Sequence, residues 1–140
     1  IVHFTSSKLD KTRPVHLLGI GDPRDIWDFV ADGIDTFDCV SPTRIARHGS
    51  ALVKGKQGKI NLKNVKYKNN LNPIDNECNC YTCKNFTLAY LYHLFSAKEL
   101  LGLQLLTSHN IYFMNNLMKE VRSSIDNNDF DNAKKKWLNS

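Results

Sequence analysis

The first quarter of the chain alternates an apolar run, an amphipathic stretch and a run rich in β-formers. Residues 15–20 are nearly all apolar, which predicts a strand buried on both faces of a parallel sheet. Residues 26–30 place apolar side chains on one helical face, and residues 34–40 again favour a strand. This order predicts one β-α-β unit. Because such a unit leaves two strand edges unpaired, we expect more sheet elsewhere.

Local signals mark both ends of the expected helix. Asp22 predicts an N-cap, and Pro23 suits the first helical position. Gly33 is expected to end the helix as a left-handed cap. Residues 5–14 are polar and predict a loop, since Pro14 disfavours a helix before it.

After the second strand this alternation stops. Residues 51–62, punctuated by glycines, predict a hairpin. Residues 85–101 carry apolar side chains at helical spacing, and Gly102 is expected to end that helix. A second helix is predicted over residues 108–126. The lysine-rich residues 134–137 predict a frayed basic end, with an RNA contact as the alternative. The apolar stripes of both helices are typical of ordinary core.

Composition narrows the class of protein. The 140 residues are 41% hydrophobic, which suits one domain with a buried core. A net charge of +5 and a pI near 9.0 indicate an anionic partner, nucleic acid first and a membrane surface second. No apolar run approaches the length of a spanning helix and no signal-peptide pattern opens the chain, so we expect a cytoplasmic protein that contacts no membrane. The abrupt apolar start at Ile1 suggests a cut end.

Three thiols lie within six residues, at Cys78, Cys80 and Cys83. Thiolate sulfur binds Zn²⁺ tightly, and structural sites commonly take three Cys and one His. Thiols at this spacing can converge on one ion, whereas disulfides between them would be strained. Two disulfides among the four cysteines are the alternative, but nothing else in the sequence indicates a secreted domain.

Two histidines follow the thiols, and either one offers a fourth ligand. His109 is favoured over His93 because Thr107-Ser108 resembles a helix start. A ligand at a helix end can face back toward the thiols, whereas a histidine inside a helix must be aimed by packing.

A carboxylate at the end of the second strand is the main candidate for chemistry. Asp38 lies where α/β barrels and open sheets place their ligands, and a charge there is costly unless it is used or paired. Arg44 and Arg47 follow, and each can bind phosphate bidentately. From the residues alone, a structural ion pair between Asp38 and one of these arginines is as well supported as a catalytic role.

The hairpin region is rich in lysine. These side chains either track a nucleic-acid backbone or form a solvated surface, and the sequence leaves both open. The lysines are Lys54, Lys56, Lys59, Lys63, Lys66 and Lys68.

Three motifs together resemble one family. They are Phe-Asp-Cys-Val-Ser-Pro-Thr-Arg-Ile-Ala-Arg at residues 37–47, Leu-Gly-Ile-Gly at residues 18–21, and Cys-x-Cys-x-x-Cys followed by His109. In order and spacing they resemble the tRNA-guanine transglycosylases, which insert 7-deazaguanine bases into tRNA. The thiol cluster alone is weak evidence, but the combination is specific and covers nearly the whole chain.

The resemblance implies an α/β fold, namely the C-terminal portion of a (β/α)₈ TIM barrel with a zinc-binding insertion after the last strand. Asp38 matches the nucleophilic aspartate, and Arg44 and Arg47 match tRNA-contacting arginines. Leu18, where the family usually has Met, and Gly19 match positions that contact the base. The residues that match the ligands of one structural Zn²⁺ are Cys78, Cys80, Cys83 and His109.

The implied activity is exchange of guanine in a tRNA anticodon for a 7-deazaguanine base of the queuosine pathway. A carboxylate stabilises the positive anomeric carbon and then traps it as a covalent Asp-ribose intermediate, which the incoming base displaces. The family resemblance also implies a homodimer of the full-length enzyme. Because a complete barrel takes roughly 250 residues, we expect a C-terminal fragment that lacks the acid/base and most base-recognition residues and is inactive alone.

On this interpretation residues 1–40 are the last β-α-β unit of the barrel. Residues 41–110 hold the basic hairpin and the zinc-binding subdomain, and residues 111–140 the C-terminal helix and tail. The alternatives are a non-catalytic zinc-knuckle RNA-binding module, a regulatory paralogue, or a structural zinc domain from another barrel enzyme. Asp38 within its matching motif argues against the paralogue.

Overall fold

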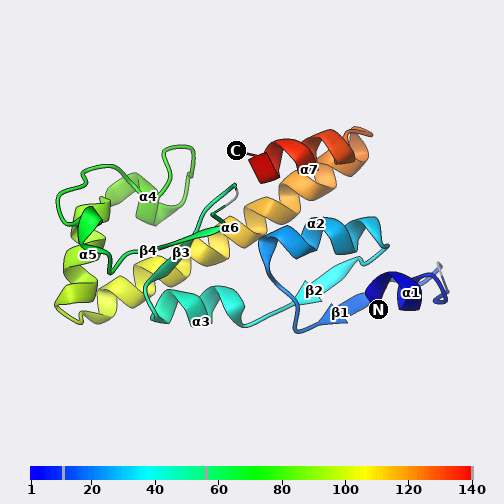
Figure 1. The fold of residues 1–140 in the computed structure, drawn as a ribbon, viewed down its shortest axis with the longest axis horizontal. Coiled ribbons are helices and arrows are strands. Elements are labelled where there is room, and N and C mark those ends of the chain that lie inside the picture. The colour runs from blue at the N-terminus through cyan, green and yellow to red at the C-terminus, as the bar shows by residue number, and fades with distance from the viewer. Residues whose placement is uncertain (11, 56, 140) are drawn as a thin grey trace. The chain divides into compact units, whose positions relative to one another are not determined.

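The helices and strands of the computed structural model fall into two compact units, Ile1–Ser41 and Pro42–Ser140 (Figure 1). The structure describes residues 1–10, 12–55 and 57–139. Within these residues it is mixed α/β, as predicted.

The first unit is the predicted β-α-β arrangement. Strand β1 (His16–Leu18), helix α2 (Pro23–Ala31) and strand β2 (Thr36–Asp38) follow in order, and the two strands pair in parallel. Figure 1 shows β1 and β2 side by side, with α2 connecting them. A short helix α1 (Val2–Ser6) precedes them, so the predicted loop over residues 5–14 begins too early.

The predicted ends of α2 are confirmed. The Asp22 carboxylate accepts a hydrogen bond from the backbone N–H of Arg24 at 3.0 Å, and Pro23 occupies the first turn. Gly33 takes a φ of +86° just after the helix, and its N–H donates to the Val30 carbonyl at 2.9 Å. Both signals act through neighbours in sequence, which is why the sequence predicted them.

The prediction that the first strand is buried on both faces is wrong. In β1 and β2 the middle residue is half-buried and the outer two are exposed, and Leu18 keeps 75% of its surface accessible. Among the described residues this parallel sheet has only these two strands. The exposed face carries the polar side chains of His16, Thr36 and Asp38 beside Leu18, whereas a strand buried on both faces is apolar throughout.

Gly21 lies near the end of the β1–α2 connection, just before the N-cap Asp22, and against the residue that follows β2. A Cβ at position 21 would lie 2.5 Å from the Cys39 Cβ, closer than any real contact. Only glycine therefore allows the connection to pass the end of β2 at this distance.

The second unit begins with helix α3 (Ser41–Arg47, its first residue in the first unit) and the predicted hairpin. Strand β3 (Ser50–Leu52) pairs antiparallel with β4 (Lys59–Asn61), with Ala51 opposite Ile60. The structure thus confirms the predicted hairpin, whose strands begin at residue 50 and end at residue 61 instead of 51 and 62.

Helices form the rest of the second unit. They are the 3₁₀ helix η1 (Val65–Tyr67), α4 (Tyr81–Asn85), α5 (Leu88–Ser96), α6 (Leu100–Asp126) and α7 (Phe130–Asn139). Residues of the hairpin, η1, α4, α5 and the first half of α6 share one apolar core, which includes Leu62, Leu91 and Leu106, each fully buried. Although α6 spans 27 residues, neither it nor any other described helix is long and apolar enough to cross a membrane.

Two predicted boundaries between the long helices are wrong. Gly102 lies inside α6, and α6 begins at Leu100 instead of residue 108. A Cβ at Gly102 would lie 3.1 Å from the Leu94 Cβ, so the glycine allows α5 and α6 to pack closely and does not end a helix. The chain turns at Lys98, which takes a left-handed φ of 60° after α5.

The predicted frayed tail is also wrong. Residues 130–139 form α7, and Trp137 is only 4% exposed. Its ring packs edge-on against Phe113 of α6, with centroids 6.1 Å apart. The lysines that suggested fraying lie on a helix which this buried tryptophan fixes to α6.

Candidate metal centre and functional site

Four side chains converge on one point in the second unit. The ligand atoms of Cys78, Cys80, Cys83 and His109 all lie within 4.8 Å of one another. His109 Nδ1 is 3.8, 3.4 and 3.4 Å from the three sulfurs, in chain order. A tetrahedral zinc with ordinary bond lengths separates N and S by about 3.6 Å. The donor set and its spacing therefore fit one Zn²⁺, and the predicted convergence is confirmed.

Packing between α4 and α6 brings the ligands together. Cys80 is the N-cap of α4, where its sulfur accepts from the backbone N–H of Cys83 at 3.3 Å. Thr82, fully buried, donates its hydroxyl to the Leu105 carbonyl of α6 at 2.7 Å. His109 follows one turn later on α6. The expected ligand is thus in place, but it lies inside a long helix and not at a helix start.

A backbone carbonyl of the hairpin orients the His109 ring. Its Nε2 lies 2.9 Å from the Leu52 carbonyl oxygen of β3, and both groups are buried. A carbonyl oxygen can only accept, so Nε2 carries the proton and Nδ1 presents its lone pair to the thiols. That is the tautomer which a metal at this position requires.

Burial and mutual hydrogen bonds shift the pKa values of Cys80, Cys83 and His109, and they favour the thiolate at Cys80. The hydrogen bond from the Cys83 thiol lowers the pKa of Cys80 to about 3. The same bond, together with burial, raises the pKa of Cys83. Although burial lowers the pKa of His109, hydrogen bonds with Cys78 and Cys80 raise it to about 9, so a proton and a metal ion compete for the Nδ1 lone pair. A buried thiolate needs a positive partner, and a cation held by all four groups supplies it.

The two alternatives to this ligand set do not fit the structure. All four cysteines, Cys39 included, are free thiols, which is contrary to two disulfides. His93 lies exposed on α5, whereas His109 is fully buried among the sulfurs.

In the first unit, Asp38 ends β2 and lies beside β1. His16 Nε2 lies 3.1 Å from Asp38 Oδ1, and the backbone N–H of Gly19 donates to the same oxygen at 3.4 Å. His16 Nδ1 lies 2.8 Å from the Thr36 hydroxyl oxygen, so Thr36 donates when Nε2–H points at the carboxylate. Within the first unit, the partner that the structure gives the Asp38 carboxylate is His16.

The strand register places the candidate site residues on one face. His16 pairs with Thr36, and Leu18 pairs with Asp38. Because side chains alternate along a strand, these four share a face of the sheet. Leu18 is exposed on that face, and Gly19 takes a φ of +73°, with open space where a Cβ would be. A ligand that touches Leu18 therefore lies beside Asp38.

The two candidate phosphate-binding arginines share a helix. Arg44 and Arg47 lie three residues apart on α3, and both are exposed. Side chains at this spacing project from the same side of a helix. Together they offer two guanidinium groups on one surface.

The lysines of the hairpin region divide into different roles. Lys54 Nζ forms an ion pair with Glu120 Oε1 at 2.8 Å, so it links the hairpin to α6. Lys66 lies over the Tyr67 ring at 4.9 Å from the centroid. Lys59, Lys63 and Lys68 are exposed, and Lys56 lies outside the described residues.

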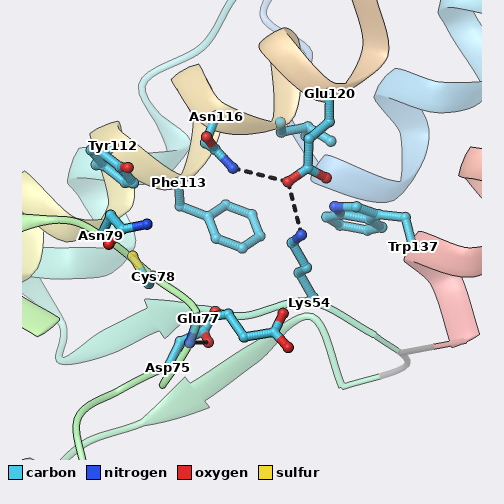
Figure 2. A pocket seen from close by; sticks show the side chains of 11 residues that line it. Lys54, Asp75, Glu77, Cys78, Asn79, Tyr112, Phe113, Asn116, Glu120 and Trp137 are labelled. Carbon is cyan, nitrogen blue, oxygen red and sulfur yellow. Dashed lines mark hydrogen bonds and ion pairs between the residues drawn. The ribbon is translucent and has the colours of Figure 1, made fainter. Parts of the chain in front are cut away.

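A cavity of about 260 Å³ adjoins the metal centre (Figure 2). Lys54 Nζ and Asn116 Nδ2 both donate to Glu120 Oε1, at 2.8 and 2.9 Å. Figure 2 shows these two contacts, with Phe113 and Trp137 nearby. Cys78, the one half-buried ligand of the four, also lines it. The sequence did not predict this cavity, because the side chains that line it come from four separate segments: the hairpin, residues 75–79, α6 and α7.

Comparison with known proteins gives one consistent family. Residues 1–140 match the family model described as Queuine tRNA-ribosyltransferase. Proteins of that name are 49% identical over 130 residues in Clostridium kluyveri, 50% over 127 in Thermosipho africanus and 44% over 137 in Dehalococcoides mccartyi (strain ATCC BAA-2266). The alignments cover 93%, 91% and 98% of this chain, but 34% of each relative. The chain thus spans about a third of the length of these curated relatives.

Proposed function

We propose a tRNA-guanine transglycosylase function because the chain belongs to the queuine tRNA-ribosyltransferase family. The family match over residues 1–140 is the observation that carries this proposal. The enzyme would exchange guanine in a tRNA anticodon for a 7-deazaguanine base. Since the relatives are about three times longer, the chain would supply only part of the catalytic apparatus.

The β1-α2-β2 unit would form the last part of a (β/α)₈ barrel. Its parallel pairing is the one that a barrel uses, and Asp38 ends β2 where barrels place their active sites. The two-stranded sheet leaves its strand edges unpaired among the described residues, and further barrel strands would pair with them. The insertion after β2 would hold the hairpin and the metal centre.

Asp38 would be the nucleophile. One carboxylate oxygen attacks the ribose C1′ as its bond to N9 of guanine breaks, and the electron pair of that bond leaves with guanine. N9 of the incoming base then attacks C1′, gives up its proton to a general base outside this chain, and releases the carboxylate. His16 and Gly19 both bind Oδ1, so they would hold the carboxylate with Oδ2 directed at the ribose. The proton donor for guanine would come from residues outside this chain.

Leu18 would contact one face of the purine. It is exposed on the sheet face that also carries Asp38, and an apolar side chain at that position suits an aromatic ring. Gly19, with no side chain, leaves room for the base to approach the backbone.

The anticodon-bearing RNA would lie across α3 and the hairpin. Arg44 and Arg47 would contact phosphates, since guanidinium groups bind phosphate bidentately. Exposed Lys59 and Lys63 would add sequence-independent affinity. Lys54 would not, because its ion pair with Glu120 directs it toward α6.

The Zn²⁺ would be structural. Four protein ligands complete a tetrahedron and leave no position for water or substrate. When bound, the ion supplies cross-linking and charge neutralisation, and it would fix α4 and the hairpin to α6. We also propose a cytoplasmic location, where these thiols stay reduced, and a homodimer of the full-length enzyme.

Labelled guanine exchange tests the proposal. The full-length protein that carries this chain is mixed with tRNA and labelled guanine, and label in the RNA is measured for wild type, Asp38→Asn and Asp25→Asn. Asp25 is exposed on α2 and is not one of the residues that bind the Asp38 carboxylate, so its variant makes the same chemical change outside those contacts. We expect exchange by wild type and Asp25→Asn and a loss of at least a thousandfold in Asp38→Asn. Undiminished exchange in Asp38→Asn would exclude it as nucleophile, and RNA binding without any exchange would favour the non-catalytic zinc module.

A further inference from the structure

A fully buried asparagine next to His109 links helix α6 to the hairpin. The Asn110 Oδ1 accepts from the backbone N–H of Leu52 at 2.9 Å. Its Nδ2 donates to the carbonyls of Pro42 at 2.9 Å and Ser50 at 3.0 Å. Asn110 therefore holds both ends of β3 and the start of α3, and its amide has all these partners without water.

The same strand residue serves Asn110 and the metal ligand. The backbone N–H of Leu52 donates to Asn110, and the Leu52 carbonyl accepts from the Nε2–H of His109. Two adjacent residues of α6 are therefore hydrogen-bonded to the same residue of β3. Moving Leu52 would move the acceptor that fixes the imidazole tautomer and ring angle. Both side chains are fully buried, so bulk water does not replace either partner.

We infer that Asn110 is a positioning residue of the metal centre, which fixes Leu52 of β3 so that His109 presents Nδ1 to the ion. Outer partners of metal-bound histidines commonly contribute ten- to a hundredfold to metal affinity. Here the partner is a strand carbonyl, and Asn110 fixes that strand. Metal binding and the position of the basic hairpin are thereby coupled, whatever reaction the protein catalyses.

Zinc affinity tests this inference in the full chain. The dissociation constant is measured by competition with a chelator of known affinity for wild type, Asn110→Ala and Asn115→Ala. Asn115 is exposed on the same helix, so its variant makes the same chemical change on the opposite side. We expect zinc binding at least tenfold weaker in Asn110→Ala and unchanged in Asn115→Ala. Equal affinity of Asn110→Ala and wild type would overturn the inference.

A second background separates positioning from a general loss of folding. In His109→Cys the ligand is a thiolate with no second N–H to orient. We expect Asn110→Ala to weaken zinc binding there by less than about threefold. A loss as large as in the histidine background would show that Asn110 only supports the fold, and would overturn the inference.

Proton exchange at the imidazole gives a readout independent of affinity. In the zinc-loaded chain, ¹⁵N-edited NMR should show the His109 Nε2–H exchanging slowly with water, and Asn110→Ala should accelerate that exchange. If Asn110→Ala does not fold, Asn110→Ser is used in its place. Unchanged exchange in a folded, zinc-loaded variant would contradict the inference.

Discussion

His16 and Asp38 face each other across the ends of β1 and β2, and this contact leads to a residue-scale prediction. His16→Gln should lower kcat for base exchange about tenfold with little change in KM for tRNA, since a charge-assisted hydrogen bond that aims the carboxylate is weakened. His93→Gln, an exposed histidine of α5, is the matched control. Steady-state kinetics of the full-length protein measure both, and a KM effect without a kcat effect would contradict the positioning role.

The sequence marked Asp38 because strand ends in α/β sheets hold ligands, but it did not mark His16 or Asn110. A polar residue inside the otherwise apolar run of residues 15–20 was the available signal for His16. For Asn110 it was a second polar residue beside the chosen ligand. Their partners lie about twenty and nearly sixty residues away, at Asp38 and Leu52, and register at that range is set by tertiary packing.

At the scale of elements, the turn between α5 and α6 contains a residue whose replacement should raise the stability of the chain. Lys98 takes a φ of 60°, a conformation that costs a residue with a side chain about 1 kcal/mol and costs glycine little. Lys98→Gly should therefore stabilise the chain by about 1 kcal/mol in the free energy of unfolding. Lys119→Gly, exposed inside α6, should destabilise it by about 1 kcal/mol.

Urea denaturation of the zinc-loaded chain measures both variants. The opposite signs are the test, because any general effect of replacing lysine by glycine shifts both variants the same way. Destabilisation by Lys98→Gly would mean that its side chain contributes more than its backbone conformation costs.

The helices α2 and α6 show why some helix boundaries were predictable from the sequence and others were not. Asp22 and Gly33 act on their own neighbours in sequence, and both predicted ends of α2 are confirmed. Gly102 looked like another stop, but its role is to let α5 approach α6, which no local pattern reveals. Thr107-Ser108 resembles a helix start but lies inside α6, so the sequence favours the right ligand, His109, for an incorrect reason.

At the scale of the whole molecule, zinc removal should affect the two units differently. Apparent binding energies of structural zinc are about 10 to 16 kcal/mol, so chelation should unfold residues 70–110 and loosen β3 through the Leu52–His109 bond. The β1-α2-β2 unit contains none of the four ligands and should keep its structure. Hydrogen exchange before and after chelation measures this, and equal exchange in the second unit would contradict the structural role of the metal.

The proposed activity depends on a covalent bond between Asp38 and a ribose of tRNA. The most direct measurement is to mix the full-length protein with tRNA in the absence of an incoming base, denature the mixture, and look for a protein–RNA adduct by gel mobility and by mass spectrometry of digested peptides. We predict an adduct on the peptide that carries Asp38 in wild type and in Asp25→Asn, and none in Asp38→Asn. An adduct of equal yield in Asp38→Asn, or one mapped to another residue, would contradict the account.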